Sequence, residues 1–167
     1  MKNILLGVSL LFSVLVNAQE YNVELKFSFD PIDQVTNCFA TFNNVMTNEN
    51  KDVGIIIQPV IDYNNGKLSS SNWIVEAVGL GPCQYESTLI ILFSDDSRVV
   101  VSSWNDINCD GVAYFEFEGT DIYKLSTKEI QLIRYVNGFN ESKVTGPPVS
   151  KDYFKQLYTE IRLFNNK

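Results

Sequence analysis

Residues 87–104 read STLIILFSDDSRVVVSSW, and this stretch is the strongest structural signal in the chain. Two runs of β-branched and large apolar residues flank the polar segment SDDS. Such runs around a short polar turn are typical of a β-hairpin. With 95–97 as the loop, the expected pairing places Phe93 opposite Val99 and Thr88 opposite Trp104.

The same pairing, carried outward along the chain, predicts a disulfide bond. It places Cys83 opposite Cys109, and directly opposed residues of an antiparallel pair have Cα atoms about 4.5–5.5 Å apart, which is within disulfide reach. We therefore predict that Cys83 and Cys109 are bonded and that Cys38, the third cysteine, is free.

Further strands are predicted by alternating apolar and polar residues or by short apolar runs bounded by turn residues. These segments are 20–29, 53–63, 72–80, 112–119 and 130–136. A short helical turn is expected at 120–129, and the longest loop at 137–149. Inside the strand 112–119, Ala113, Phe115 and Phe117 are expected to face the core.

Two segments instead have apolar residues at three- and four-residue spacing, the pattern of an amphipathic helix. The first begins at Asp30-Pro31, a pair that suits a helix start. Its apolar positions are Ile32, Val35, Phe39, Phe42 and Met46. The second follows Ser150 and reaches Phe164.

These elements predict one α+β domain over residues 19–167. We expect a mostly antiparallel sheet with an N-terminal and a C-terminal helix packed on one face, because sequential strands with short connections usually pair antiparallel. No internal repeat or linker divides the chain.

Residues 1–18 have the pattern of a secretory signal peptide, with Lys2, an apolar run over 4–16 and a cleavage position after Ala18. No later segment is apolar enough to predict a membrane span. The leader MKN…VNAQ, with the Asn- and Ile-rich composition, resembles those of small exported proteins of Bacteroidetes-type bacteria. That resemblance implies a periplasmic or secreted location.

The composition excludes several kinds of chemistry. The chain has no histidine, which removes Ser-His-Asp and Cys-His catalysis and His-ligated zinc. Its net charge of −7 disfavours nucleic acid and anionic membranes as partners. A carboxylate pair remains available for acid–base chemistry, since Glu116 and Glu118 share one strand face about 7 Å apart.

The segment WNDINCDG, residues 104–111, matches the first half of a calcium-binding loop. Asp106, Asn108 and Asp110 supply alternating side-chain oxygens and Gly111 permits a sharp turn. The position that should carry a bidentate acid is Phe117. The alternative is a polar turn between strands, because Asn and Asp bond their own backbone and Asp-Gly favours turns. Calcium is the one cofactor that the sequence suggests.

Four aromatic residues, Trp73, Tyr85, Trp104 and Tyr114, are candidates for lining one sheet surface. Tryptophan and tyrosine are enriched at binding surfaces, where they stack on sugar rings or partner side chains. Trp104 is the leading candidate because Asn105 and Asp106 follow it directly. Trp73 and Tyr114 complete the predicted ligand-binding set.

The sequence therefore predicts an exported, non-enzymatic domain that binds an unidentified protein or glycan. One alternative is a cell-envelope inhibitor or immunity-type protein, with the loop 137–149 as its protruding element. Another alternative is a histidine-free carboxylate hydrolase built on the acids named above.

Overall fold

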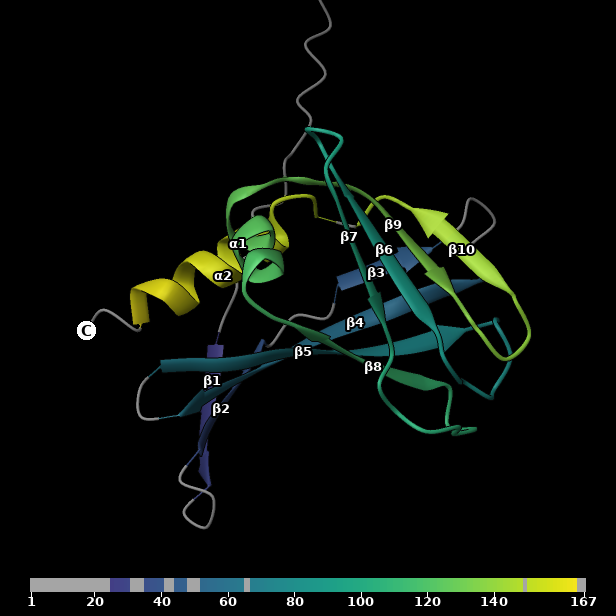
Figure 1. Cartoon of the computed structure of the whole chain (residues 1–167), viewed down its shortest axis with the longest axis horizontal. Coiled ribbons are helices and arrows are strands. Elements are labelled where there is room, and N and C mark those ends of the chain that lie inside the picture. The colour runs from purple at the N-terminus through teal and green to yellow at the C-terminus, as the bar shows by residue number, and fades with distance from the viewer. Residues whose placement is uncertain are drawn as a thin grey trace, which may run out of the picture.

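The computed structural model describes residues 25–30, 35–40, 44–47, 52–64, 67–148 and 150–164. The predicted signal peptide and the first part of the predicted N-terminal strand lie outside these residues. The described part is mainly antiparallel β-structure, arranged as two sheets with two short helices (Figure 1).

The first sheet has six strands, and alternating burial along its long strands separates a core face from an outer face. Its neighbours run β1-β2-β4-β5-β8, while β3 pairs with the edge of β4 beyond β2. The strands are β1 (Leu25–Asp30), β2 (Val35–Ala40), β3 (Asn44–Thr47), β4 (Gly54–Asn64), β5 (Lys67–Val78) and β8 (Val112–Phe117).

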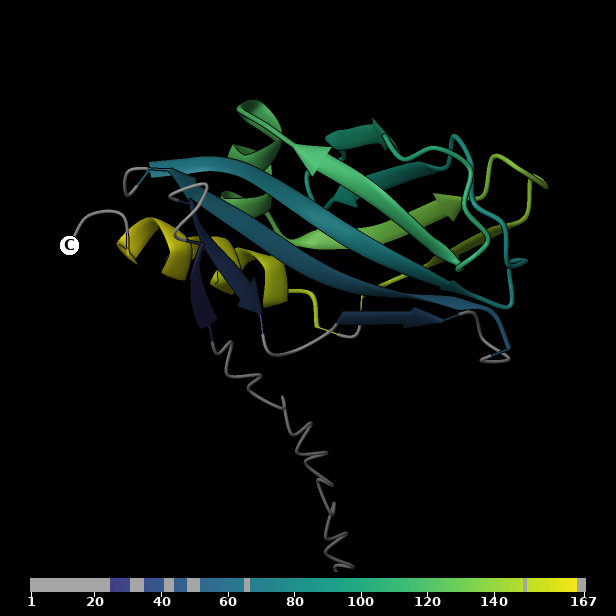
Figure 2. The ribbon, with the colours of Figure 1, turned by 90° about the horizontal axis from the view of Figure 1, so that it is seen from below.

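The second sheet has the order β10-β9-β6-β7 and faces the first across the core (Figures 1 and 2). Its strands are β6 (Thr88–Phe93), β7 (Arg98–Ser102), β9 (Ile130–Val136) and β10 (Lys143–Gly146). At the edges of the sheets, β7 lies near β8 and β10 lies near β3. The two sheets therefore enclose a common apolar interior.

The helices α1 (Thr120–Thr127) and α2 (Tyr153–Phe164) contact each other at one end of the sheets (Figure 1). The apolar side of α2 is buried in the core. There the Phe154 ring stacks on Trp73 of β5, with ring centroids 4.3 Å apart, and Trp73 also lies 4.6 Å from Phe117 of β8. Phe115 meets Tyr135 of the second sheet edge-on.

The predicted N-terminal helix is wrong, and with it the predicted α+β arrangement of two terminal helices on a sheet. Residues 35–40 and 44–47 instead form β2 and β3, which both pair with β4. The segment is rich in β-branched, aromatic and Asn residues, whose helix propensity is modest. The long β4 needs partners on its second edge, and hydrogen bonding to that edge outweighs the weak helical pattern.

Cys38 lies in this corrected region, fully buried and free, as predicted. Burial raises the pKa of its thiol to about 11, so that the reactive thiolate is disfavoured at neutral pH. Cys38 therefore acts as a small core residue.

Two further expectations need correction. Within the predicted loop 137–149, residues 143–146 form β10, which pairs with β9. In the hairpin of β6 and β7, Thr88 pairs with Ser102 and Leu92 with Arg98, a shift of two residues from the predicted pairing. Because side chains alternate with a period of two, this shift leaves every side chain on its predicted face.

Candidate functional site

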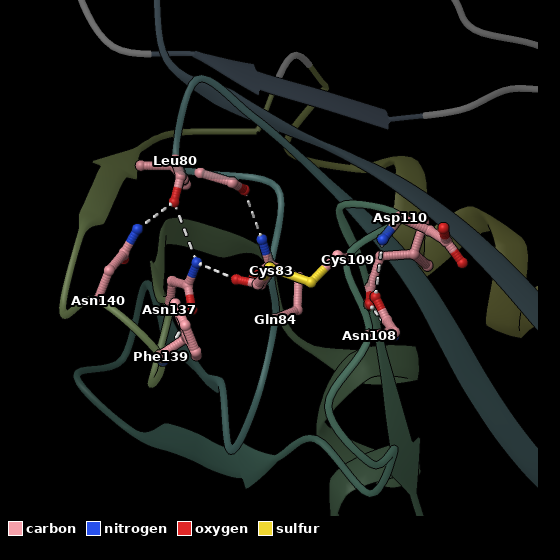
Figure 3. Close-up of a disulfide and its surroundings, with 11 residues drawn as sticks. Leu80, Cys83, Gln84, Asn108, Cys109, Asp110, Asn137, Phe139 and Asn140 are labelled. Atoms are coloured by element: carbon pink, nitrogen blue, oxygen red, sulfur yellow. Dashed lines mark hydrogen bonds between the residues drawn. A yellow bond between two sulfur atoms is a disulfide. The ribbon is translucent and has the colours of Figure 1, made fainter.

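The predicted disulfide between Cys83 and Cys109 is present, next to the open end of the β6–β7 hairpin (Figure 3). Beside it, Gln84 and Asn108 exchange backbone hydrogen bonds of 2.7 and 3.1 Å. Nearer the hairpin, the Ser103 amide donates to the Ser87 carbonyl. Between these two points, residues 85–86 lie opposite the longer segment 104–107. The two extra residues on the second side cancel the two-residue shift of the hairpin, so that Cys83 still lies opposite Cys109.

The turn that joins β9 to β10 is fixed to the disulfide-bonded loop (Figure 3). The carbonyl oxygen of Leu80 accepts hydrogen bonds from Asn137 Nδ2 (3.0 Å), Asn140 Nδ2 (2.9 Å) and Ser142 Oγ (2.8 Å). Asn137 Nδ2 also donates to the Cys83 carbonyl at 2.9 Å. These hydrogen bonds anchor the turn to the disulfide-bonded loop, while residues 138–141 at its tip are exposed. The inhibitor role predicted for the loop 137–149 stays a prediction.

A buried polar cluster supports the same loop from inside. The Tyr135 hydroxyl is hydrogen-bonded to Gln84 Oε1 and, at 3.0 Å, to Ser87 Oγ. Burial raises the pKa of Tyr135, so its hydroxyl stays neutral and remains available as a donor. The disulfide, the Leu80 carbonyl and this cluster together hold the backbone that carries residues 103–107.

Trp104 is the most prominent side chain on this backbone, with 61% of its surface exposed. Its ring centroid lies 5.3 Å from that of Tyr114 on β8. The Trp104 amide donates to the Tyr114 carbonyl at 3.0 Å, and Asn105 Oδ1 accepts the Tyr114 amide at 2.9 Å. Residues 104–105 therefore take the place of a neighbouring strand at this point of β8 and fix the indole against Tyr114.

Tyr114 lies on the outer face of the first sheet. Across the ladder its neighbours on this face are Ile74 of β5 and then Gln58 of β4, and the adjacent row pairs Glu116 with Asn72. Side chains at such opposed positions are about 4.5–5.5 Å apart at Cβ. Figure 2 looks onto this face, with the second sheet behind it. Beside the aromatic pair, the outer face therefore carries the apolar Ile74, the amide Gln58 and the carboxylate Glu116.

On the loop side, the opposed segments 85–86 and 104–107 also carry Tyr85 and Ile107, with 41% and 55% of their surfaces exposed. The Glu86 side chain is hydrogen-bonded to the Tyr85 hydroxyl and raises the pKa of Tyr85, and the charge of Asp106 acts in the same direction. We call Tyr85, Trp104, Ile107 and Tyr114, with the carboxylates Glu86, Asp106 and Glu116, the Trp104 surface.

Trp73, the third predicted ligand-binding residue, lies elsewhere. It is fully buried, and its indole Nε1 donates to the Tyr158 hydroxyl at 3.0 Å. Trp73 pairs with Phe115 of β8, which was predicted to face the core. Paired residues point to the same face of a sheet, so both side chains point into the core. The outward residue of this part of β5 is Ile74, which the sequence did not single out as part of a surface.

The predicted calcium ligands Asp106, Asn108 and Asp110 lie in the turn beside the disulfide. Asn108 Oδ1 accepts the Asp110 amide at 3.3 Å, while its Nδ2 donates to the Val112 carbonyl at 2.8 Å. Among the residues that the structure describes, no three Asp, Glu, Cys or His side chains gather as a metal site. The turn is closed by its own hydrogen bonds, and calcium binding stays a prediction.

The carboxylates proposed for hydrolysis are both exposed. Glu116 lies on the outer face of β8, while Glu118 follows the end of that strand. Glu116 therefore has a clear place on the Trp104 surface, whereas an acid–base role for the pair stays an untested alternative.

No helix among the described residues is long and apolar enough to cross a membrane. No family model, curated protein or solved structure matches this chain.

Proposed function

We propose that this protein is an exported, non-enzymatic binding domain whose ligand surface is the Trp104 surface. One observation carries the proposal: a largely exposed tryptophan is held against a second aromatic ring beside exposed carboxylates. A tryptophan side chain is usually highly buried, so a largely exposed one is unusual. Trp and Tyr are also enriched among the interface residues that contribute most of the binding energy.

The support beneath this surface favours binding. Backbone hydrogen bonds fix Trp104 to Tyr114, and the disulfide anchors the same segment at Cys109. A rigid surface loses little conformational entropy when it binds, which increases affinity for a given contact area. The candidate ligands at this stage are a protein segment or a glycan.

An exported location agrees with two features of the chain. The first 18 residues have the pattern of a signal peptide, and the Cys83–Cys109 bond is of a kind that persists in oxidising compartments. The proposal therefore places the binding partner in the periplasm or outside the cell.

Tryptophan fluorescence gives a direct test. The chain has two tryptophans, of which Trp73 is buried and Trp104 exposed. A ligand that covers Trp104 should shift the emission to shorter wavelength and protect it from acrylamide quenching. The probes are a panel of soluble polysaccharides and the envelope fraction of the producing cell, the latter also assayed by capture on immobilised protein.

Trp104→Ala should abolish or strongly weaken the interaction, and Tyr123→Ala is the matched control. Tyr123 is an equally exposed aromatic residue, at 64%, but it lies on α1. A partner that binds Trp104→Ala as tightly as it binds the wild type would overturn the proposed surface.

A further inference from the structure

We infer that the ligand of the Trp104 surface is a cationic, arginine- or lysine-bearing segment of a partner protein. Its cationic group would stack on the Trp104–Tyr114 pair and meet the neighbouring carboxylates. This inference rests on the proposed function and narrows it from a protein or glycan to one class of ligand.

The described charged side chains around the aromatic pair are all acidic. The segments that build the loop side, residues 79–97, 99–123 and 135–142, contain no Lys or Arg. On β4, β5 and β8 the described outward side chains include Asp62, Glu76 and Glu116 but no basic residue. Lys26, which is exposed, belongs to β1 at the opposite edge of this sheet. A cationic ligand would meet attraction here without a competing repulsion.

No described Lys or Arg forms an ion pair with Glu86, Asp106 or Glu116, the carboxylates of the Trp104 surface. The ion pairs between described residues join Lys128 to Asp95 and Lys151 to Glu129, both outside the Trp104 surface. The hydrogen bond to Glu86 is the largest cause of the raised pKa of Tyr85, and the charges of Glu86 and Asp106 also raise it. A bound ammonium or guanidinium group would neutralise these charges.

The geometry of the aromatic pair and its neighbouring carboxylates also suits a cation. The largely exposed Trp104 ring has its centroid 5.3 Å from that of the Tyr114 ring. A cation within about 6 Å of the face of such a ring is attracted by its electron density. Glu116 follows Tyr114 by two residues on the same strand face, about 7 Å away along the strand. Asp106 follows Trp104 by two residues along the loop. Arginine suits this arrangement because its planar group stacks on rings while its edge donates to carboxylates.

Binding of synthetic peptides tests the inference on the full mature chain. The probes are an oligoarginine peptide, an oligoglutamate peptide of the same length and a neutral cello-oligosaccharide, each followed by calorimetry and tryptophan emission. We expect the oligoarginine peptide alone to bind with a shift in Trp104 emission, and its affinity to fall as salt rises.

The variants separate stacking from ion pairing. Trp104→Ala should weaken oligoarginine binding about tenfold, because a cation–π contact and apolar contact area are lost together. Glu116→Gln keeps the shape of the side chain and should weaken binding about two- to fivefold, the usual range for an exposed ion pair. The controls Tyr123→Ala and Glu160→Gln, at exposed positions on the two helices, should bind like the wild type.

Each other outcome overturns the inference. Equal binding of oligoarginine to the wild type and to Trp104→Ala would show that the peptide is attracted only by the net negative charge of the protein. Trp104-dependent binding of the cello-oligosaccharide without oligoarginine binding would replace the cationic ligand by a glycan and leave the proposed function intact. If no probe binds while envelope capture still depends on Trp104, the ligand class is wrong and the surface is right. If capture fails too, the proposed function also fails.

Discussion

At the scale of single residues, the two tryptophans show how position within a strand decides the role of a side chain. Trp73 has its ring in the core and its Nε1 on the Tyr158 hydroxyl, whereas Trp104 lies on a loop and is mostly exposed. The sequence identified both as aromatic candidates of one kind. The alternation of side chains on β5 places Trp73 on the buried face, together with Ser71 and Val75. Trp104 lies outside any strand and is not subject to this alternation.

Tyr158 is the residue whose substitution tests this buried junction between α2 and β5. Its hydroxyl is hydrogen-bonded to Ser71 Oγ at 2.5 Å and accepts the Trp73 indole donor. Tyr158→Phe should lower the free energy of unfolding at neutral pH by about 1–3 kcal/mol, because Trp73 Nε1 and Ser71 are left buried without their partner. Urea denaturation measures the change. Tyr123→Phe, at an exposed position, is the control and should change nothing.

The same residue should also make stability depend on alkaline pH. Burial raises the pKa of Tyr158 from 10.0 to about 12, although its hydrogen bonds to Ser71 and Trp73 act the other way. A folded pKa above the unfolded value means that this stability is complete below pH 10 and is lost as pH rises toward 12. Wild-type stability should therefore fall between these values, and Tyr158→Phe should fall less steeply. Parallel curves would contradict the assignment.

At the scale of elements, the sequence predicted best where a pattern was both long and regular. The strands near β4, β5, β6, β8 and β9, the short helix α1 and the last helix α2 lie close to the predicted segments. The disulfide was also predicted, although the hairpin register behind it was shifted. The compensating residues 104–107 carry no pairing pattern, so the sequence gives no signal for their extra length.

The N-terminal third failed for a different physical reason. Its apolar spacing fits a helix, but its β-branched residues fit a strand, and local propensity alone separates these states poorly. The decisive interaction is pairing of β2 and β3 with β4, which is not encoded within the segment itself. For the candidate site, the sequence identified Trp104 and Tyr114. It could not show that Ile74 lies beside Tyr114, because that proximity depends on the pairing of β5 with β8.

The disulfide is the element-scale feature with the most direct stability test. It joins residues 26 positions apart, and replacing Cys83 and Cys109 together by Ser should lower the free energy of unfolding by about 3–4 kcal/mol, the loop-entropy estimate for that length. Urea denaturation of the double variant and of the reduced wild type should agree. Both should keep the β6–β7 hairpin, because its pairing is independent of the bond. Unchanged stability in both would contradict this role.

At the scale of the whole molecule, two sheets and α2 share one core. Trp73 of the first sheet stacks on Phe154 of α2 and contacts Phe117 of its own sheet, while Phe115 of the first sheet meets Tyr135 of the second. Neither sheet has a separate apolar interior among the described residues, since the buried apolar side chains form a single cluster. Unfolding of any one part should therefore expose the buried faces of the others.

Removal of α2 tests this dependence. A chain that ends at Ser150 loses five fully or nearly fully buried side chains, Tyr153, Phe154, Leu157, Tyr158 and Ile161. Burying a large side chain of this kind stabilises a fold by about 1.5–3 kcal/mol, so losing five of them removes about 7.5–15 kcal/mol. That loss is comparable to the total stability of about 5–15 kcal/mol that is typical of a domain. The truncated chain should keep β-type far-UV circular dichroism but lose near-UV signal and cooperative melting, and it should bind a hydrophobic dye. Its Trp73 should become accessible to acrylamide, whereas in the full chain only Trp104 is. Cooperative melting of the truncated chain with Trp73 still protected would mean that the two sheets alone make the core, with α2 as a later addition to a finished fold.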